Sequence, residues 1–371
     1  MIMTRTKTAI RFAIVGLGHF AQSAILPAFA NTRNTAALAA LVTGDVEKAA
    51  KLKRKYKVPA CSYEDYEELL ESGEIDAVYI ATPNSEHRKY AVMAARRGVH
   101  VLCEKPLAYT VKDAQAIVDA CEKGDVRLMT AYRLHFEEGN LQAIEVIKSG
   151  RIGDPRLFAS VHTMLVDPDN IRTDLSLGGG PLEDIGIYCL NAARYIFQNE
   201  PEEVSAVAVY GRDPRFKEVP EAYSVTMRFP QDRLATFLCG FGQTKVSEYR
   251  VIGTKGILQM DPAYTWQDDI EQSITIKGKS RMRTFKHRDQ IAAEILYFAD
   301  CIQKGKTPEP SGREGLVDVR IMEAIRNAAK KERRVAISSP EKRTRPDGSQ
   351  SIKRQPHGQP KLVKAAPPST E

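Results

Sequence analysis

A glycine-rich turn between an apolar strand and a helix is the feature that constrains this chain most. Residues 12–16 are mostly apolar and predict a buried strand that ends in a glycine. The strand leads into a G-x-G-x-x-A spacing at Gly16, Gly18 and Ala21, followed by apolar side chains near helical spacing. The first glycine permits a tight turn, the second lets backbone approach a pyrophosphate, and the small third residue lets the helix pack on the strand. The sequence therefore predicts a dinucleotide-binding unit, with an ordinary strand-to-helix turn as the alternative.

Length and cysteine usage limit the kind of protein this is. The chain has 371 residues, which favours two domains over one core. No apolar run is long enough to cross a membrane, and the N-terminal sequence shows no export signal. The six cysteines are scattered, without C-x-x-C pairs. We therefore expect reduced thiols, a cytoplasmic protein and no metal site.

Much of the net charge of +7 lies in the C-terminal tail. From Ser338 onward, seven Lys and Arg face three Asp and Glu, so the tail carries +4 of the total. The tail is rich in Pro, Ser and Gln and lacks aromatic residues, which predicts a disordered segment over residues 338–371. We expect removal of the residues from Ser339 onward to leave assembly and activity intact. The remaining chain is close to neutral, which argues against a nucleic-acid partner.

Strands and helices alternate over the first third of the chain. Further strands are predicted at residues 36–42, 75–80, 99–103 and 127–132, with a helix at residues 113–122. This alternation predicts an α/β fold in which the first domain is a doubly wound parallel sheet of the Rossmann type.

The end of the second predicted strand bears on the choice of cofactor. An Asp or Glu at this position grips the ribose hydroxyls in NAD-binding units. Here Thr43 and Gly44 leave room for a phosphate, and Lys48 can neutralise it, which favours NADP. The alternative is that Asp45 caps a helix whose lysines form a solvated face.

Lys105 follows the fourth predicted strand, within Glu104-Lys105-Pro106. Ligands of open parallel sheets bind beyond the carboxyl ends of the strands, so a lysine at this edge is well placed to meet one. A surface lysine without a role is the alternative.

The second half of the chain is rich in strands. They are predicted at residues 156–167, 204–211, 222–229, 233–242, 249–260 and 270–277, followed by helices at 290–303 and 313–331. Short connections predict a large, mainly antiparallel open sheet. Helices suffice for one face of this sheet only, so we expect the other face to be covered by a second subunit, in a homodimer or homotetramer.

A triple glycine precedes the most informative helix of this half. Pro181 suits a first helical position, and Asp184 and Tyr188 are four residues apart on one helix face. A tyrosine beside a lysine can move a proton on or off a hydroxyl near neutral pH. The alternative is a buried tyrosine whose hydroxyl is hydrogen-bonded.

Together these motifs resemble the glucose–fructose oxidoreductase / inositol dehydrogenase / MocA family, especially its glucose–fructose oxidoreductase branch. The resemblance covers about residues 11–337 and includes AIVGLGHFA, LVTGDVEKA, YIATPNSEH, HVLCEKPLA and GGGPLEDIGIYCLNAARY. It implies a cofactor domain at residues 1–134 and a domain for substrate and oligomer contacts at residues 135–337.

The resemblance also implies roles for individual residues. Lys105 would contact nicotinamide ribose and substrate, Tyr188 would donate or accept the proton, and Asp184 would orient the substrate. The positions that match cofactor contacts of the family are Gly16, Gly18, His19, Phe20, Thr43, Gly44, Lys48, Tyr63, Pro83, Asn84, His87, Glu104, Lys105 and Arg133.

The sequence departs from that branch in two places. The twin-arginine signal and the N-terminal arm of its exported members are not expected here. Residues 167–174 do not match the Trp- and Arg-rich loop of the branch, and this loop is expected to contact sugar. The prediction is an NADP-dependent oxidoreductase acting on the CH–OH group of a sugar or polyol, with no membrane partner. The alternatives are a simple NADP-dependent aldopentose or trans-dihydrodiol dehydrogenase, and a non-catalytic NADP-binding regulator of the same fold.

Overall fold

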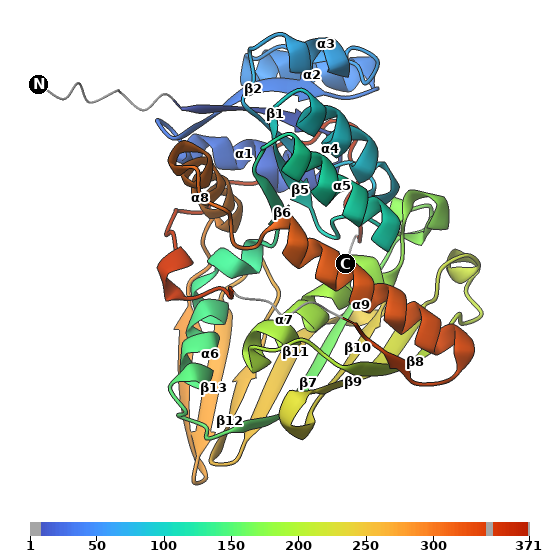
Figure 1. Ribbon diagram of the computed structural model, residues 1–371, viewed down its shortest axis with the longest axis vertical. Helices are drawn as coiled ribbons and strands as arrows, with labels where there is room; N and C mark the ends of the chain where they lie inside the picture. The colour runs from blue at the N-terminus through green and yellow to red at the C-terminus, as the bar shows by residue number, and fades with distance from the viewer. Residues whose placement is uncertain (1–8, 339–343, 370–371) are drawn as a thin grey trace, which may run out of the picture.

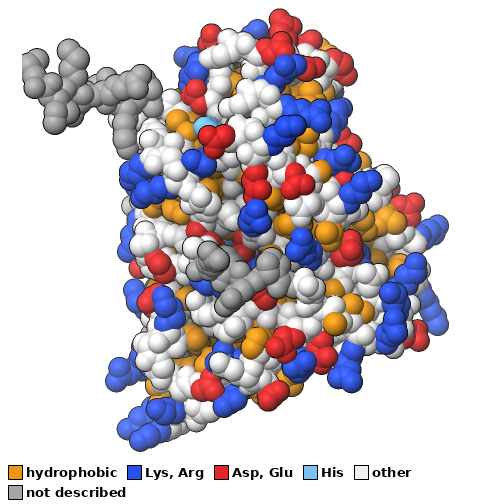
Figure 2. Space-filling model, in the orientation of Figure 1, with side chains coloured by type: hydrophobic (Ala, Val, Ile, Leu, Met, Phe, Trp, Pro, Cys, Tyr) orange, Lys and Arg blue, Asp and Glu red, His pale blue; other side chains and the backbone are white. Residues whose placement is uncertain are grey.

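The computed structural model describes residues 9–338 and 344–369, which form two sheets with helices packed on them. Figure 1 shows the first sheet in the upper part of the molecule and the second sheet in the lower part. None of the helices in these residues is long and apolar enough to cross a membrane. On the face seen in Figure 2, acidic and basic side chains are interspersed rather than gathered by sign.

The first sheet is parallel throughout and has the strand order β3-β2-β1-β4-β5-β6. Its strands are β1 (Ile10–Val15), β2 (Ala36–Val42), β3 (Ala60–Cys61), β4 (Ala77–Ile80), β5 (His100–Glu104) and β6 (Leu128–Ala131). The helices that follow them are α1 (Leu26–Ala28), α2 (Val46–Tyr56), α3 (Tyr66–Glu71), α4 (His87–Arg96) and α5 (Val111–Lys123). The predicted doubly wound parallel sheet is confirmed, and β1 and β4 are buried along nearly their whole length, as parallel strands covered on both faces must be.

The second sheet is mixed, with the order β14-β13-β12-β11-β7-β10-β9-β8-β15. Only β7 and β10 pair in parallel among these strands; their other pairings are antiparallel, as predicted. The strands are β7 (Pro155–Leu165), β8 (Glu203–Val209), β9 (Ala222–Phe229), β10 (Arg233–Gly240), β11 (Gly242–Gly253), β12 (Gly256–Met260), β13 (Ile270–Ile276), β14 (Lys279–Phe285) and β15 (Val335–Ala336). The segment 249–260 is a hairpin of β11 and β12 that turns at Thr254 and Lys255.

Three helices cover one face of the second sheet: α6 (Glu138–Lys148), α7 (Ile187–Phe197) and α9 (Gly312–Lys331). The opposite face carries exposed apolar side chains, among them Leu157 on β7, Val207 on β8 and Leu234 and Leu238 on β10. Leu238 is 49% exposed although it lies in the middle of a nine-stranded sheet. An apolar sheet face of this kind is a usual site of subunit contact.

The last two long helices join the two sheets. The helix α8 (Gln290–Lys304) packs on the first sheet, where Phe298 lies with its ring centroid 6.3 Å from that of Phe12. The helix α9 contacts both α5 and β8. The first core is therefore completed by residues from the end of the chain, so the two domains are not independent segments of sequence.

The C-terminal segment, residues 344–369, differs from the disorder predicted for it. Gln350 donates to the carbonyl of Glu309 at 2.6 Å, Arg345 pairs with Glu200 at 2.9 Å, and Asp289 donates to the carbonyl of Arg354 at 3.1 Å. Ile352 and Val363 pack against the core of the first sheet. A polar segment without its own core can thus be ordered by a core that other residues supply. Residues 339–343 and 370–371 of the predicted tail lie outside the described residues.

Candidate active site

The turn after β1 has the shape that a dinucleotide requires. Gly16 has φ +93°, and a Cβ there would lie 2.6 Å from the carbonyl oxygen of Ala81, so only glycine fits. At Gly18, by contrast, a Cβ would meet no atom within 4 Å, which leaves room beside the backbone. The following helix opens with a π-helical turn at Ala21–Ile25. An open glycine backbone at the start of a helix is a cradle that fits a pyrophosphate.

The end of β2 shows the helix cap that the sequence suggested as one interpretation. The side chain of Asp45 accepts a hydrogen bond of 2.9 Å from the backbone N–H of Lys48 and so caps α2. The ring of Tyr63 lies against Gly44, where an added Cβ would be 3.2 Å from it. Thr43 and Gly44 therefore present a small-residue edge next to the N-terminus of α2, where an anion is favoured.

Lys105, Asp184 and Arg172 form a partly buried chain of charges at the carboxyl end of β5. The Nζ of Lys105 donates to the carbonyl oxygen of Asp184 at 2.7 Å and to its Oδ1 at 3.0 Å. The Nε of Arg172 donates to Oδ2 of the same carboxylate at 2.6 Å. Both oxygens of Asp184 are thus held by cations, which makes this carboxylate the centre of the cluster.

The charges of this cluster stabilise one another. Burial alone would raise the pKa of Asp184, but Arg172 and Lys105 outweigh it and hold that pKa well below its ordinary value. Burial likewise disfavours the ammonium of Lys105, yet Asp184, Tyr188 and Glu104 raise its pKa above the ordinary value. The lysine is therefore charged and the aspartate ionised at neutral pH.

Tyr188 lies beside this cluster at the start of α7. The Nζ of Lys105 is 5.0 Å and the Cζ of Arg133 is 4.8 Å from the centre of its ring. The ring stacks on Tyr264 with 6.0 Å between centroids, and His162 lies 5.7 Å away. Two cations therefore lie beside the ring of this half-buried tyrosine. Asp184 itself lies in a π-helical turn, Leu182–Gly186, directly before α7; such turns are frequent at functional sites.

Several predicted cofactor residues act as supports in this structure. Arg133 is buried and donates to the carbonyl of Tyr264 at 2.6 Å and to Oε1 of Gln290 at 2.7 Å. Asn84 donates to the carbonyl of Gly178 at 2.8 Å and so ties the loop after β4 to the triple glycine. His87 lies between the carbonyls of Pro106 and Thr82, and burial lowers its pKa from 6.5 to about 4.

Glu104 belongs to a second buried group below Lys105. The hydroxyl of Tyr79 lies 2.8 Å from Glu104 and 2.9 Å from Glu294, and burial raises the pKa of both carboxyls. A hydroxyl between two carboxyls can donate to only one of them, so the other carboxyl must carry a proton to donate in return. Glu104 and Glu294 together therefore carry one negative charge near Lys105 rather than two.

The remaining predicted residues surround the glycine turn. Phe20 contacts the ring of Trp266 edge-on at 5.9 Å. His19 is half-buried, and burial together with nearby Arg172 lowers its pKa. Pro83 directly precedes the 3₁₀ turn Asn84–Glu86 that leads into α4. Arg172 thus lies near His19 and also binds Asp184, which in turn binds Lys105, so the structure brings the glycine turn, the end of β5 and the turn before α7 close together.

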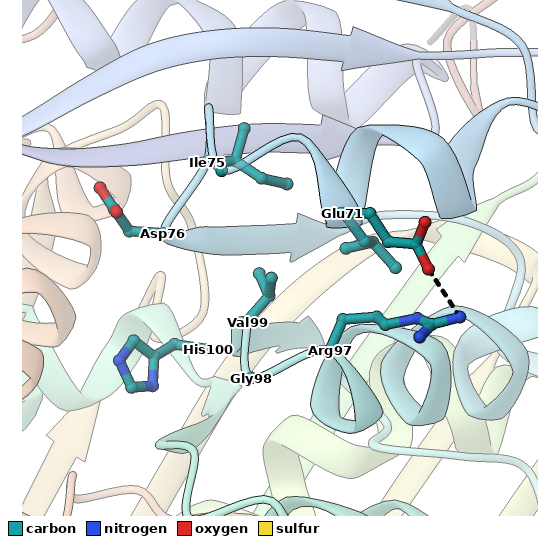
Figure 3. A pocket seen from close by; sticks show the side chains of 9 residues that line it. Glu71, Ile75, Asp76, Arg97, Gly98, Val99 and His100 are labelled. Atoms are coloured by element: carbon teal, nitrogen blue, oxygen red, sulfur yellow. Dashed lines mark ion pairs between the residues drawn. The ribbon is translucent and has the colours of Figure 1, made fainter.

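A hollow lies at the opposite ends of the strands of the first sheet. It is lined by Asp76, His100 and the segment Arg97–Val99, at the amino ends of β4 and β5 (Figure 3). Arg97 there is paired with Glu71 at 2.8 Å. This hollow is at the wrong end of parallel strands for a ligand site.

Comparison with known proteins identifies the family. Residues 10–132 match the Gfo/Idh/MocA oxidoreductase family with an NAD-binding Rossmann fold, and residues 140–259 match the Gfo/Idh/MocA C-terminal domain. The chain belongs to the Gfo/Idh/MocA family. The resemblance seen in the sequence, the oxidoreductase class and the nicotinamide dinucleotide cofactor are thereby confirmed.

Relatives of this Gfo/Idh/MocA protein cover most of its length. D-xylose 1-dehydrogenase [NADP(+)] of Haloarcula marismortui is 31% identical over 343 residues, which are 90% of this chain and 95% of that protein. Aldose-aldose oxidoreductase from Caulobacter crescentus, solved with glycerol, has a TM-score of 0.85 and 37% identity over 89% of this chain and 100% of its own. A 3-ketoreductase from Actinomadura kijaniata, solved with NADP and TDP-benzene, has a TM-score of 0.79 and 25% identity over 86% of this chain and 98% of its own.

Three residues of the Gfo/Idh/MocA site had no role assigned from the sequence. Arg172 lies in the loop at residues 167–174, which does not match the Trp- and Arg-rich loop of the glucose–fructose oxidoreductase branch, so only its position in that loop could have indicated it. Tyr264 follows β12 in an irregular segment with no distinctive pattern. His162 lies on β7, and burial lowers its pKa to about 3, so this histidine is neutral beside Tyr188.

Proposed function

We propose that this protein is an NADP-dependent oxidoreductase that transfers a hydride between nicotinamide and a sugar or related polyol. The observation that carries the proposal is the charge chain of Lys105, Asp184 and Arg172, with Tyr188 beside it at the carboxyl end of β5. Bound NADP supplies or accepts the hydride. Two of the relatives named above are a xylose dehydrogenase and an aldose-aldose oxidoreductase, which favours an aldose as substrate.

Each site residue has a distinct part in this proposal. Tyr188 gives its proton to, or takes it from, the substrate oxygen whose carbon changes oxidation state. Lys105 stabilises the negative charge that develops on that oxygen and on the phenol. Asp184, fixed by two cations, accepts from a neighbouring substrate hydroxyl and so orients the ring.

The cofactor is held by the residues predicted from the sequence. Gly16, Gly18, His19 and Phe20 surround the pyrophosphate, whereas Thr43, Gly44, Lys48 and Tyr63 surround the 2′-phosphate. Pro83, Asn84, His87, Glu104, Lys105 and Arg133 lie along the path to the nicotinamide. We assign residues 1–134 to the cofactor domain and residues 135–337 to the substrate and oligomer domain.

The protein is also proposed to be a homo-oligomer of the cytoplasm. The exposed apolar face of the second sheet, with Leu157, Leu234 and Leu238, favours a second copy of the chain as its cover. All six cysteines are free thiols, which suits a reducing compartment.

A paired-sugar assay tests the proposed function. Purified protein is given one aldose, or an aldose together with a second aldose or ketose, with and without added NADP, and products are followed by chromatography. We expect oxidation of one sugar and reduction of another without added NADP if the cofactor stays bound. A simple aldopentose or dihydrodiol dehydrogenase would need stoichiometric added NADP, and a non-catalytic regulator would convert nothing.

A further inference from the structure

The C-terminal segment contacts the glycine turn itself. The buried side chain of Gln22 donates to the carbonyl of Val363 at 2.9 Å and accepts from its N–H at 2.8 Å. The same Nε2 also donates at 2.9 Å to the carbonyl of Leu17, the residue between the two turn glycines. One buried amide therefore links the backbone of the C-terminal segment to the backbone of the proposed pyrophosphate site.

The next residue along this segment, Lys364, lies at the end of β2 and start of α2. Its Nζ is 2.7 Å from Glu47 and 3.5 Å from Asp45. These two carboxylates flank the position proposed for a 2′-phosphate and would repel it. A cation shared between them offsets that repulsion and remains half-exposed, so it is available to an anion.

The segment then crosses to the other domain. The carbonyl of Pro368 accepts from the N–H of Asp167 at 2.9 Å, and Asp167 follows β7 at the start of the loop that carries Arg172. Pro368 is four positions after Lys364, so this span is at most about 14 Å long. Residues 360–368, here called the strap, are therefore fixed at both the cofactor domain and the substrate domain.

We infer that the strap completes the cofactor site, with Lys364 selecting NADP over NAD and the strap as a whole slowing cofactor release. The inference rests on the proposed NADP dependence. It reverses the expectation from composition that the tail is dispensable.

Binding measurements on two lysine variants test the role of Lys364. Affinities for NADP and NAD are measured by calorimetry without sugar, for the wild type, Lys364→Ala and Lys361→Ala. The control removes the same charge from the same segment and keeps the carbonyl of residue 361 that accepts from Lys55. We expect Lys364→Ala to weaken NADP binding by about 3- to 10-fold and NAD binding by less than about 2-fold. The difference between the two effects should be smaller at high salt. Equal effects of the two variants, or tighter NADP binding by Lys364→Ala, would overturn the assignment.

Release kinetics test the strap. Protein loaded with NADPH is mixed with excess NADP, and the loss of bound NADPH fluorescence is timed for the wild type and for a chain ending at Gln359. We expect release at least about tenfold faster from the shortened chain, equivalent to about 1.4 kcal/mol. Release from the shortened chain at the wild-type rate would contradict the claim that the strap slows cofactor release. A wild type that binds neither dinucleotide would contradict the proposed function instead.

Hydrogen exchange gives a second test that needs no truncation. The N–H of Val363 is bonded to Gln22, and its exchange is followed in the full chain with and without NADP. We expect NADP to slow this exchange but not that of the Ser349 N–H, which is bonded to Asp347 outside the strap. Equal exchange rates at Val363 in both states would show that the strap does not respond to the cofactor.

Discussion

Lys105 donates two hydrogen bonds to Asp184, one to its backbone carbonyl at 2.7 Å and one to its carboxylate at 3.0 Å. The lysine follows β5 of the first sheet, and the aspartate precedes α7 on the second, so this contact joins the two halves of the site. Its geometry holds Lys105 next to Tyr188 and away from solvent.

Asp184→Asn keeps the shape of this contact and removes its charge. We expect kcat/KM for the sugar to fall about 10- to 100-fold, because Lys105 and Arg172 would then share a partly buried site without their common anion. NADP affinity should change little. Steady-state kinetics with parallel binding measurements check this, and Glu183→Gln, one residue away and paired with Arg326 instead, is the matched control. Equal losses in both variants would show that Asp184 only stabilises the fold.

His87 predicts an acid-sensitive contribution to stability. The pKa of His87 is about 4 in the folded protein and 6.5 for an unperturbed histidine. The contribution of the neutral His87 to the free energy of unfolding is therefore complete above pH 6.5 and is lost as the pH falls toward 4. Urea unfolding of the wild type and His87→Gln at pH 7 and pH 5 measures it. Between pH 7 and pH 5, we expect the free energy of unfolding to fall by about 2 kcal/mol more in the wild type than in the variant. The same loss in both proteins would exclude a neutral buried His87.

The exposed apolar face of the second sheet predicts that a charge in its centre prevents assembly. Leu238→Glu places a carboxylate on β10 among apolar neighbours, and burying it between subunits would be unfavourable. We expect light scattering at micromolar concentration to show an oligomer for the wild type and a monomer for this variant. Lys112→Glu, an exposed change on α5, should leave the mass of the oligomer unchanged. A monomeric wild type would contradict the proposed assembly.

The sequence predicted the first sheet well because its strands are short, continuous apolar runs bounded by glycine or proline. The predicted strand over residues 36–42 coincides with β2, and the helix predicted at 313–331 begins one residue late. The strand β14 was not predicted, because Lys279, Arg281 and Arg283 lie on it and its face is almost fully exposed. A strand this rich in charge lacks the apolar pattern used for prediction, and β14 is recognised as an edge strand from its backbone pairing with β13.

The site could be predicted where its residues adjoin regular elements. Lys105 follows a strand and Tyr188 begins a helix, so both had a definable place. Arg172 reaches Asp184 from a short 3₁₀ turn, Ile171–Thr173, and Lys364 reaches Asp45 across 319 positions of sequence. No local pattern encodes such contacts, since they depend on how separate elements pack. The same holds for the C-terminal segment, whose composition predicted disorder because the core that orders it lies elsewhere in the chain.

Single-turnover hydride transfer with Tyr188→Phe tests the central claim most directly. Protein loaded with NADPH is mixed with an aldose found in the paired-sugar assay, and oxidation of the nicotinamide is followed for the wild type, Tyr188→Phe, Lys105→Ala and the double variant. Tyr264→Phe is the matched control, because its ring stacks on Tyr188 while its hydroxyl lies 2.7 Å from Ser160. We expect Tyr188→Phe to bind NADPH normally and to react about 100- to 10,000-fold more slowly, with the double variant little slower than the slower single variant. A near-normal rate for Tyr188→Phe would contradict the assignment of Tyr188 as the group that moves the proton.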